Sequence, residues 1–162
     1  MLQAVPDQIP DLTMSFIASR LAMTATFVSI MAGATAQSAE LAVNVTGIEM
    51  ARGEICCALY PPDKEFLQAS SAIAGQWLEA KSGGVQCRFT GIESGAYAVA
   101  VFQDYNSNKN NDTNLFGIPT EPWGVSNNAR PMFRAPTFEE AQVSVADGKP
   151  LEISVKLETT MP

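Results

Sequence analysis

The sequence contains no histidine among its 162 residues. Histidine is the commonest general base and the commonest metal ligand in proteins. Its absence excludes Ser-His-Asp and Cys-His catalytic arrangements, and it excludes His-ligated zinc, copper and non-haem iron sites. Any catalytic or metal chemistry of this chain would therefore depend on carboxylates, amides and thiols.

Positive charge is also scarce. The chain has 10 Lys and Arg against 17 Asp and Glu, which gives a formal net charge of −7. An acidic chain repels nucleic acid and anionic lipid, so neither is expected as a partner. Hydrophobic residues make up 46% of the sequence, enough to pack a core, and the length suits one domain.

Long apolar runs are nearly absent, and the one clear run lies near the N-terminus. Residues 21–34 carry no charge, and about 14 residues are too few to span a bilayer that needs about 20. Arg20 precedes this run, and small residues at Ala34 and Ala36 follow a signal-peptidase pattern. The pattern predicts a secretory signal peptide cleaved between Ala36 and Gln37. The alternative is a buried N-terminal helix.

The predicted domain organisation follows from this signal. Residues 1–36 are an N-terminal extension and signal peptide, and residues 37–162 are a single domain without a membrane span. Residues 1–13 are acidic and contain two prolines, which suits no signal peptide, so Met14 is a candidate for the true start. We expect an exported protein, periplasmic or secreted.

Cysteine is limited to three residues, Cys56, Cys57 and Cys87. Export to an oxidising compartment permits one disulfide and leaves one odd thiol. Cys57 lies on the apolar face of a predicted strand at 54–60, and Cys87 lies on the apolar face of another at 85–90. These faces favour a Cys57–Cys87 pair. Pairing of Cys56 with Cys87, or two buried free thiols, are the alternatives.

Helical periodicity is weak, whereas alternating and short apolar runs predict strands. The run at 97–102 is apolar on both faces, which predicts a central strand. The predicted strands span residues 40–50, 54–60, 85–90, 97–102, 142–145 and 151–158. The sequence therefore predicts an all-β protein, an antiparallel β-sandwich of six to seven short strands with a long loop at one end.

Local signals refine this prediction. The short link at Arg52-Gly53 predicts an antiparallel hairpin between the first two strands, and Asp147-Gly148 predicts a hairpin turn between the last two. Asp63 is a candidate cap for a short helix through Leu67, after which a long connection follows. Thr137 is a candidate N-cap for one helical turn at 136–141.

The long loop after residue 103 has oxygen-bearing side chains at every second position. Carboxylates and amides at positions 1, 3, 5, 7 and 9 are typical of a calcium-binding loop. Lys109 stands where an EF-hand has Gly, and Glu121 is the candidate for a further carboxylate. An Asn-rich loop held by Asx-turns without an ion is the alternative. The candidate calcium ligands are Asp104, Asn106, Asn108, Asn110, Asp112 and Glu121.

The end of this loop, around Gly117–Gly124, is too apolar for a solvated segment. We expect Phe116, Ile118 and Trp123 to fold back over one end of the sandwich. The functional alternative is a ligand rim, with Trp123 as an apolar anchor. The candidate polar groups of that rim are Ser126, Asn127 and Asn128.

The segment SGAYAVAVFQDYNSNKNNDTNLFGIPTEPWGVSNNA, followed by APTFEEAQVSV, resembles the bacterial family known as domain of unknown function 2141. Two departures are Gln103, where the family often has His, and Lys109-Asn110, which replaces an Asn-Gly-Lys spacing. The resemblance implies an exported bacterial protein and brings no activity with it. The Gly-x-Tyr strand also looks like transthyretin-like sandwiches, which is an analogy of fold alone. The matching residues are Gly95, Tyr97, Ala98, Asp104, Asn106, Asn108, Asp112, Asn114, Gly117, Pro119, Glu121, Gly124, Ser126, Asn127, Asn128 and Ala129.

Two functions are consistent with these features. The first is a non-enzymatic exported module, binding or structural, that stabilises its loop with calcium and binds an envelope partner, an extracellular partner or a small ligand. The alternative is a hydrolase or lyase acting on a glycan, with Asp104, Asp112 and Glu121 as acid and base. Paired carboxylates perform glycosidic chemistry without histidine. The two differ in geometry, since an enzyme needs carboxylates facing each other across an open cleft.

Overall fold

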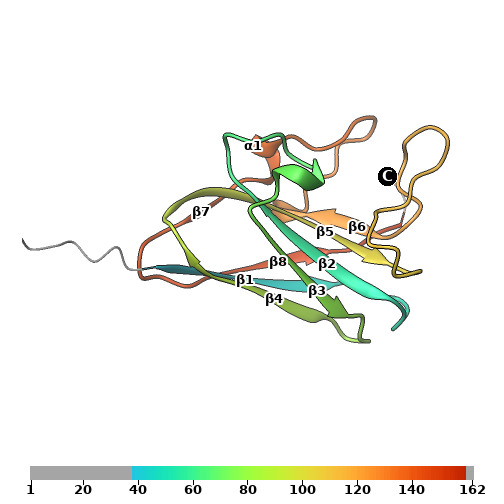
Figure 1. Cartoon of the computed structure of the whole chain (residues 1–162), viewed down its shortest axis with the longest axis horizontal. Helices are drawn as coiled ribbons and strands as arrows, with labels where there is room; N and C mark the ends of the chain where they lie inside the picture. The colour runs from blue at the N-terminus through green and yellow to red at the C-terminus, as the bar shows by residue number, and fades with distance from the viewer. Residues whose placement is uncertain (1–37, 160–162) are drawn as a thin grey trace, which may run out of the picture. The chain divides into compact units, whose positions relative to one another are not determined.

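A computed structural model describes residues 38–159, so the predicted signal peptide, its cleavage site and Met14 lie outside the described residues. The described chain forms a three-stranded sheet of order β4-β1-β8 and a five-stranded sheet of order β3-β2-β5-β6, in which β7 also pairs with β5 (Figure 1). The strands are β1 (Ala39–Thr46), β2 (Glu54–Tyr60), β3 (Ala74–Glu79), β4 (Val85–Ile92), β5 (Gly95–Asp104), β6 (Trp123–Val125), β7 (Val143–Val145) and β8 (Leu151–Lys156).

The two sheets bury one face of each strand against the other sheet. Leu41, Val43 and Val45 of β1 point inward and are almost fully buried. The alternation expected for the last strand is also present, since Leu151, Ile153 and Val155 pack on the same core. The predicted β-sandwich is therefore confirmed. The central position predicted for 97–102 is confirmed too, because β5 lies between β2 and β6.

Both predicted hairpins are wrong. β1 pairs with β4 and, in parallel, with β8, whereas β2 belongs to the other sheet. The β1–β2 link therefore crosses between sheets, and β7 and β8 likewise separate. A short link with turn residues fits a crossing between sheets as well as a hairpin. Gly53 fits its turn tightly, with φ +70° and an ideal Cβ position 1.9 Å from the carbonyl oxygen of Asp104.

Two strands were not predicted. β3 lies in the stretch expected to be a long connection, because its sequence AGQWLE offers little hydrophobic alternation. β6 has three residues, below the length at which a pattern is visible. The helix predicted after Asp63 is absent: that stretch forms turns before a short 3-10 helix, η1 (Ala69–Ser71).

The predicted helical turn near residue 137 is confirmed. The helix α1 (Phe138–Ala141) is capped at its N-terminus by Thr137, whose hydroxyl accepts a hydrogen bond from the backbone N–H of Glu140. The carboxylate of Glu140 accepts in turn from the Thr137 N–H, which completes a capping box. Arg134 holds the same carboxylate by two hydrogen bonds. Chiefly because of these bonds with Arg134, the pKa of Glu140 is lowered to about 2.

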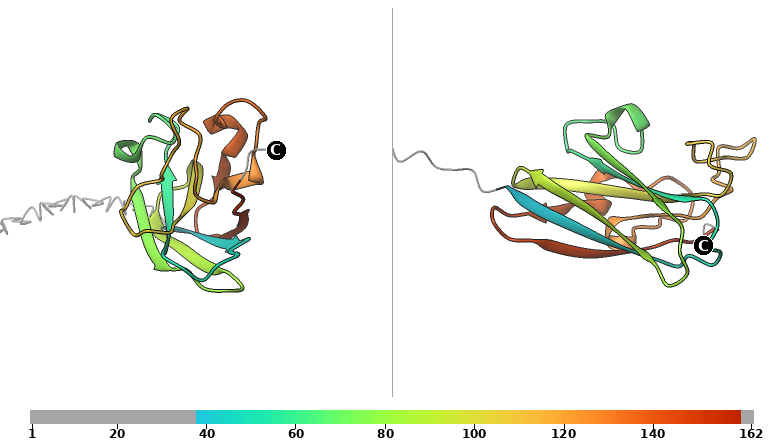
Figure 2. Two further views of the ribbon diagram at one scale, coloured as in Figure 1. Left: turned by 90° about the vertical axis from the view of Figure 1, so that its right-hand side faces the viewer. Right: turned by 60° about the horizontal axis from the view of Figure 1, so that its bottom comes forward.

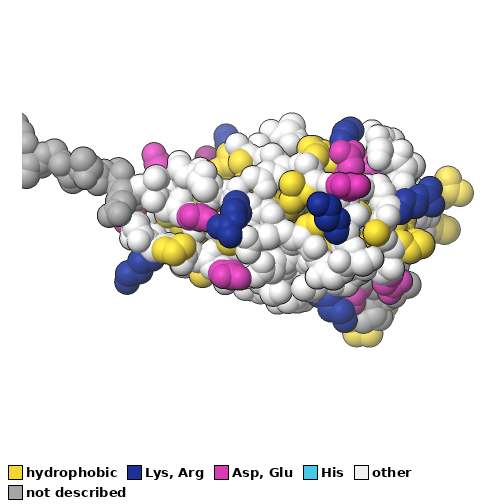
Figure 3. Space-filling view, turned by 90° about the horizontal axis from the view of Figure 1, so that it is seen from below, with side chains coloured by type: hydrophobic (Ala, Val, Ile, Leu, Met, Phe, Trp, Pro, Cys, Tyr) yellow, Lys and Arg dark blue, Asp and Glu magenta, His cyan; other side chains and the backbone are white. Residues whose placement is uncertain are grey.

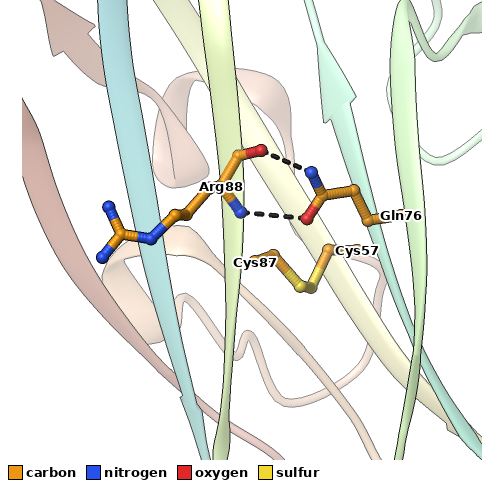
Figure 4. The surroundings of a disulfide bond; sticks show 4 residues. All are labelled: Cys57, Gln76, Cys87 and Arg88. Atoms are coloured by element: carbon orange, nitrogen blue, oxygen red, sulfur yellow. Dashed lines mark hydrogen bonds between the residues drawn. A yellow bond between two sulfur atoms is a disulfide. The ribbon is translucent and has the colours of Figure 1, made fainter.

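The predicted Cys57–Cys87 disulfide is present (Figure 4). It joins β2 to β4 and so links the two sheets across the core. Beside it, Arg88 and Gln76 exchange hydrogen bonds between β4 and β3, one of them from the Arg88 N–H to the Gln76 Oε1 at 2.9 Å. Cys56 is the free thiol and is buried.

Within residues 38–159, the structure contains no helix that is long and apolar enough to cross a membrane.

Candidate functional site

Three segments project from the outer face of the five-stranded sheet. They are residues 61–73, which contain η1, residues 105–122 after β5, and residues 129–137 before α1 (Figures 1 and 2). The first follows β2, and the second joins β5 to β6, so adjacent strands of the sheet position these segments. The outer face of the sheet is thus walled on several sides.

The floor between these segments is built from two rows of residues that cross the strands. The first row is aromatic except at its second position, and the second row is made of small residues. Side chains alternate along a strand, so both rows lie on the face opposite the core. In register, the rows are Trp77, Cys56, Phe102 and Trp123, then Gly75, Ala58 and Ala100. On β6 the second row continues with Val125, which is buried and lies outside the groove lining.

Because the second row is small, it leaves a trough beside the first. A groove of about 930 Å³ occupies this place. Its walls are completed by Leu67 and Ile73 from the first projecting segment, by Pro119 from the second, and by Pro136 from the third. The lining is therefore largely apolar, with aromatic rings along one side.

Most polar groups of the groove come from the central loop, and Tyr60 and Gln68 add a hydroxyl and an amide from β2 and the segment that follows it. Among the described lining residues, Lys109 is the one that carries a charge, and Asn110, Asn111 and Thr113 lie on the same side. No carboxylate belongs to the lining. A concave, mostly apolar site with a few polar groups on one side is typical of small-ligand sites.

The thiol of Cys56 lies on the floor of this groove and is 7% exposed. Burial raises its pKa to about 11, although the nearby Lys109 ammonium opposes this effect. The thiol is therefore protonated at neutral pH and is a weak nucleophile. It contributes to the floor as a small apolar group.

The central loop is organised by Asp104, which is fully buried. Its carboxylate accepts hydrogen bonds from the backbone N–H of Asn108 at 3.2 Å and of Lys109 at 2.7 Å. These bonds close the first turn of the loop on the end of β5. Buried backbone donors need such partners, which explains an acid at this position.

The other two carboxylates complete the loop. Glu121 is 4% exposed and accepts from the backbone N–H of Tyr105 at 2.8 Å and of Asp112 at 3.1 Å. Asp112 accepts from the side-chain amides of Asn106 and Asn108. Oxygens of all three acids thus accept N–H hydrogen bonds. Nowhere in residues 38–159 do three or more acids or cysteines converge in a geometry that could hold a metal ion.

The predicted calcium ligands are therefore brought together in one loop, but their role as ligands stays a prediction. Asn108 Oδ1 accepts from the Asn110 N–H at 2.8 Å, and Asn106 Oδ1 accepts from the Asn108 N–H at 2.9 Å. These are Asx-turn bonds of the kind expected for the alternative without an ion. Asn110 also lines the groove.

Lys109 links this loop to the groove. Its φ is +67°, so it takes the left-handed conformation that a glycine adopts readily. Its ammonium pairs with Glu54 of β2 and lies 4.3 Å from the ring centre of Trp77 of β3. The sequence comparison with an EF-hand singled out Lys109 as a mismatch and missed these contacts.

The predicted rim residues divide into two groups. Trp123 is 8% exposed and lines the groove. The other three hold the 3-10 helix η2 (Ser126–Asn128) to its neighbours and are absent from the lining of the 930 Å³ groove. Ser126 Oγ accepts from the Val99 N–H, Asn127 donates to the Gln142 carbonyl, and Asn128 accepts from the Lys156 N–H.

The prediction that Phe116 and Ile118 fold back over the sandwich is wrong. Their side chains are 87% and 42% exposed. The loop instead turns on Asn114, whose Oδ1 accepts from both of their N–H groups. Only Trp123 of the three predicted residues packs against the sheet, because β6 places it beside Phe102.

Sequence reasoning also missed the role of Gln103. This residue is fully buried in β5, and its Nε2 donates to the carbonyls of Met50 and Arg52, each at 2.8 Å. It thereby anchors the β1–β2 link where that link crosses between sheets. The available signal was a polar residue at the end of the apolar run AVAVF, at an alternate position that continues Val99 and Val101.

These features define a class: a disulfide-linked β-sandwich with a walled apolar groove on the outer face of its larger sheet. The model of a bacterial family of uncharacterised proteins, domain of unknown function 2141, matches residues 43–154, and the chain belongs to this family. The match covers most of both sheets and the whole central loop. No curated protein and no solved structure matches the chain.

Proposed function

We propose that this protein is an exported, non-enzymatic binding module whose groove takes a small, largely apolar ligand that carries an anionic or hydrogen-bond-accepting end. The observation that supports this proposal most directly is the groove of about 930 Å³ with its floor of small residues. Lys109, whose ammonium also pairs with Glu54, and the amides of Asn110 and Asn111 lie on one side, where they offer N–H donors to an acceptor end. The apolar part would lie along Trp77 and Phe102.

Export is supported by two independent features. The sequence predicts a signal peptide before Gln37, and the two sheets are joined by the Cys57–Cys87 disulfide. Structural disulfides form and persist in oxidising compartments, such as the periplasm or the extracellular medium.

The geometry does not favour the alternative glycan hydrolase or lyase. Asp104 and Glu121 are buried, and their carboxylates accept backbone N–H groups at the loop base. Asp112 is held by two side-chain amides, and none of the three lines the groove. An acid–base pair facing a cleft is therefore not formed by these residues.

Tryptophan fluorescence provides a direct test of ligand binding. The chain has two tryptophans, Trp77 and Trp123, and both line the groove. Titration with decanoate, an apolar chain with one carboxylate, is expected to change their emission saturably. Ala100→Leu places a larger side chain on the floor and is expected to weaken binding by at least about tenfold, the effect of roughly 1.4 kcal/mol.

The matched control is Ala51→Leu, the same change at an exposed position in the β1–β2 link. It is expected to bind decanoate like the parent. Equal affinity of Ala100→Leu and the parent, with both melting normally, would place the ligand elsewhere. A linear, unsaturable response to decanoate and to decanol would contradict the proposed ligand class.

We also propose calcium binding by the central loop. The Asp104 carboxylate, at the first loop position, accepts the backbone N–H groups of Asn108 and Lys109, at the fifth and sixth positions. Lys109 also has a left-handed backbone conformation, at the position where an EF-hand turn uses glycine. Both features support the proposal. Calcium at about 100 times its dissociation constant should add about 2.7 kcal/mol to the free energy of unfolding. The melting temperature should therefore rise by several degrees from chelator to calcium.

The variant that tests this site is Asp112→Asn, which keeps the shape of the side chain but removes a charge. Its melting temperature should rise less with calcium than that of the parent. Identical melting of the parent in calcium and in chelator would mean that the Asx-turns alone hold the loop.

A further inference from the structure

The tips of two projecting segments carry large apolar side chains that touch little of the protein. Leu115 and Phe116, in the central loop, are 101% and 87% exposed. Met132 and Phe133, in the segment before α1, are 58% and 92% exposed. Single exposed apolar residues are ordinary, but four of this size on two loop tips mark an interaction surface.

The two tips lie on the same side of the molecule. Both segments project from the outer face of the five-stranded sheet (Figures 1 and 2), and residues of both, such as Pro119 and Pro136, line the same groove. The apolar side chains of the two tips can therefore meet one surface together. We call these four residues the apolar tips.

The backbone of the central tip is satisfied internally. The N–H groups of Phe116 and Ile118 donate to Asn114 Oδ1 at 2.9 and 3.1 Å, and the Gly117 N–H donates to the Asn114 carbonyl at 2.9 Å. Removing an unpaired N–H from water costs several kcal/mol in a hydrocarbon environment. This tip can leave water without that cost for these three donors.

The charges around the tips also differ from those of the rest of the chain. Residues 129–137 contain no acid, and their two arginines, Arg130 and Arg134, pair with Glu158 and Glu140. The acids of 105–122 are Asp112, which is half-buried and held by two amides, and Glu121, which is 4% exposed. By contrast, the view from below shows both acidic and basic side chains on that face, with hydrophobic ones between them (Figure 3). No exposed carboxylate on these two segments would have to be dehydrated when the tips leave water.

We propose that the apolar tips insert into the interface of a zwitterionic lipid bilayer and dock the module there with its walled groove facing the membrane. The overall charge of −7 opposes anionic lipid, so the driving force is burial of apolar side chains. A protein partner would need pockets matched to separate tips, whereas a fluid bilayer accepts them without matching. This docking does not depend on the ligand of the groove.

Vesicle flotation tests the proposal with the chain from Gln37 onward, which contains every described core residue, all between positions 39 and 157. The probe is vesicles of phosphatidylcholine and phosphatidylethanolamine. The parent is expected to float with the vesicles. The double variant Leu115→Ser/Phe116→Ser should lower the partition coefficient by on the order of a hundredfold, since each inserted side chain contributes roughly tenfold.

The matched control is Met50→Ser. Met50 is 49% exposed but lies in the β1–β2 link and belongs to neither tip, so partition should stay at the parent value. Absence of the parent from the vesicle fraction, or equal losses in Met50→Ser and the double variant, would overturn the proposal. So would a parent dimer that the double variant converts to a monomer, because the tips would then be covered by a second copy.

Discussion

Replacing Cys57 and Cys87 together by alanine is expected to lower the free energy of unfolding by about 3–4 kcal/mol. The disulfide closes a loop with a sequence separation of 30 and joins β2 to β4. Cross-linking such a loop removes chain entropy from the unfolded state, which accounts for roughly 3.6 kcal/mol at this length. The loss should be measured as a lower midpoint in guanidinium chloride, and parent protein with reductant should show the same shift.

Cys56→Ala is the control for this experiment. It removes a buried sulfur from the neighbouring residue, on the opposite face of β2, without opening the loop, and we expect a loss of about 1 kcal/mol. If the double variant unfolds at the same midpoint as Cys56→Ala, the link between the sheets does not stabilise the fold.

Asp104→Ala is expected to lower the free energy of unfolding by about 1–3 kcal/mol in the presence of chelator. The change removes the acceptor of the Lys109 backbone N–H at a fully buried position, whereas the Asn108 N–H keeps Asn106 Oδ1 as an acceptor. A buried donor left without a partner costs roughly 1–3 kcal/mol. Urea unfolding in chelator measures this effect without any contribution from a bound ion.

Asn106→Ala is the comparison, because Asn106 lies in the same loop but is exposed. Its loss should stay below about 1 kcal/mol. A larger loss for Asn106→Ala than for Asp104→Ala would show that the exposed Asx-turns, rather than the buried carboxylate, hold the loop. With Asp104→Ala the groove should also loosen, since Lys109 contacts Trp77 on its wall.

Local sequence patterns predicted much of the fold. Alternation in LAVNV and in LEISV placed the inward faces of β1 and β8, and the opposed apolar faces of Cys57 and Cys87 favoured the disulfide that the structure contains. Thr137, as a candidate N-cap, predicted the start of α1. Each of these features depends on patterns within a short stretch of the chain, so each could be predicted from the sequence.

The pairing of strands was harder to predict from the sequence. Arg52-Gly53 is compatible with a hairpin and with a crossing between sheets, and the choice depends on where Gln103 and Asp104 of β5 lie. The parallel pairing of β1 with β8 joins strands more than 100 residues apart, for which no local pattern exists. The three-residue β6 is defined by its partners and not by its own sequence.

The candidate site shows the same division. The sequence by itself determined an all-β domain, a disulfide, an Asp- and Asn-rich loop, and the absence of histidine chemistry. Only the tertiary structure decided that Trp77, Phe102 and Trp123 align across four strands beside Ala58 and Ala100, and that Leu115 and Phe116 stand in solvent. The groove is a product of strand register, and register is set by contacts between segments far apart in the chain.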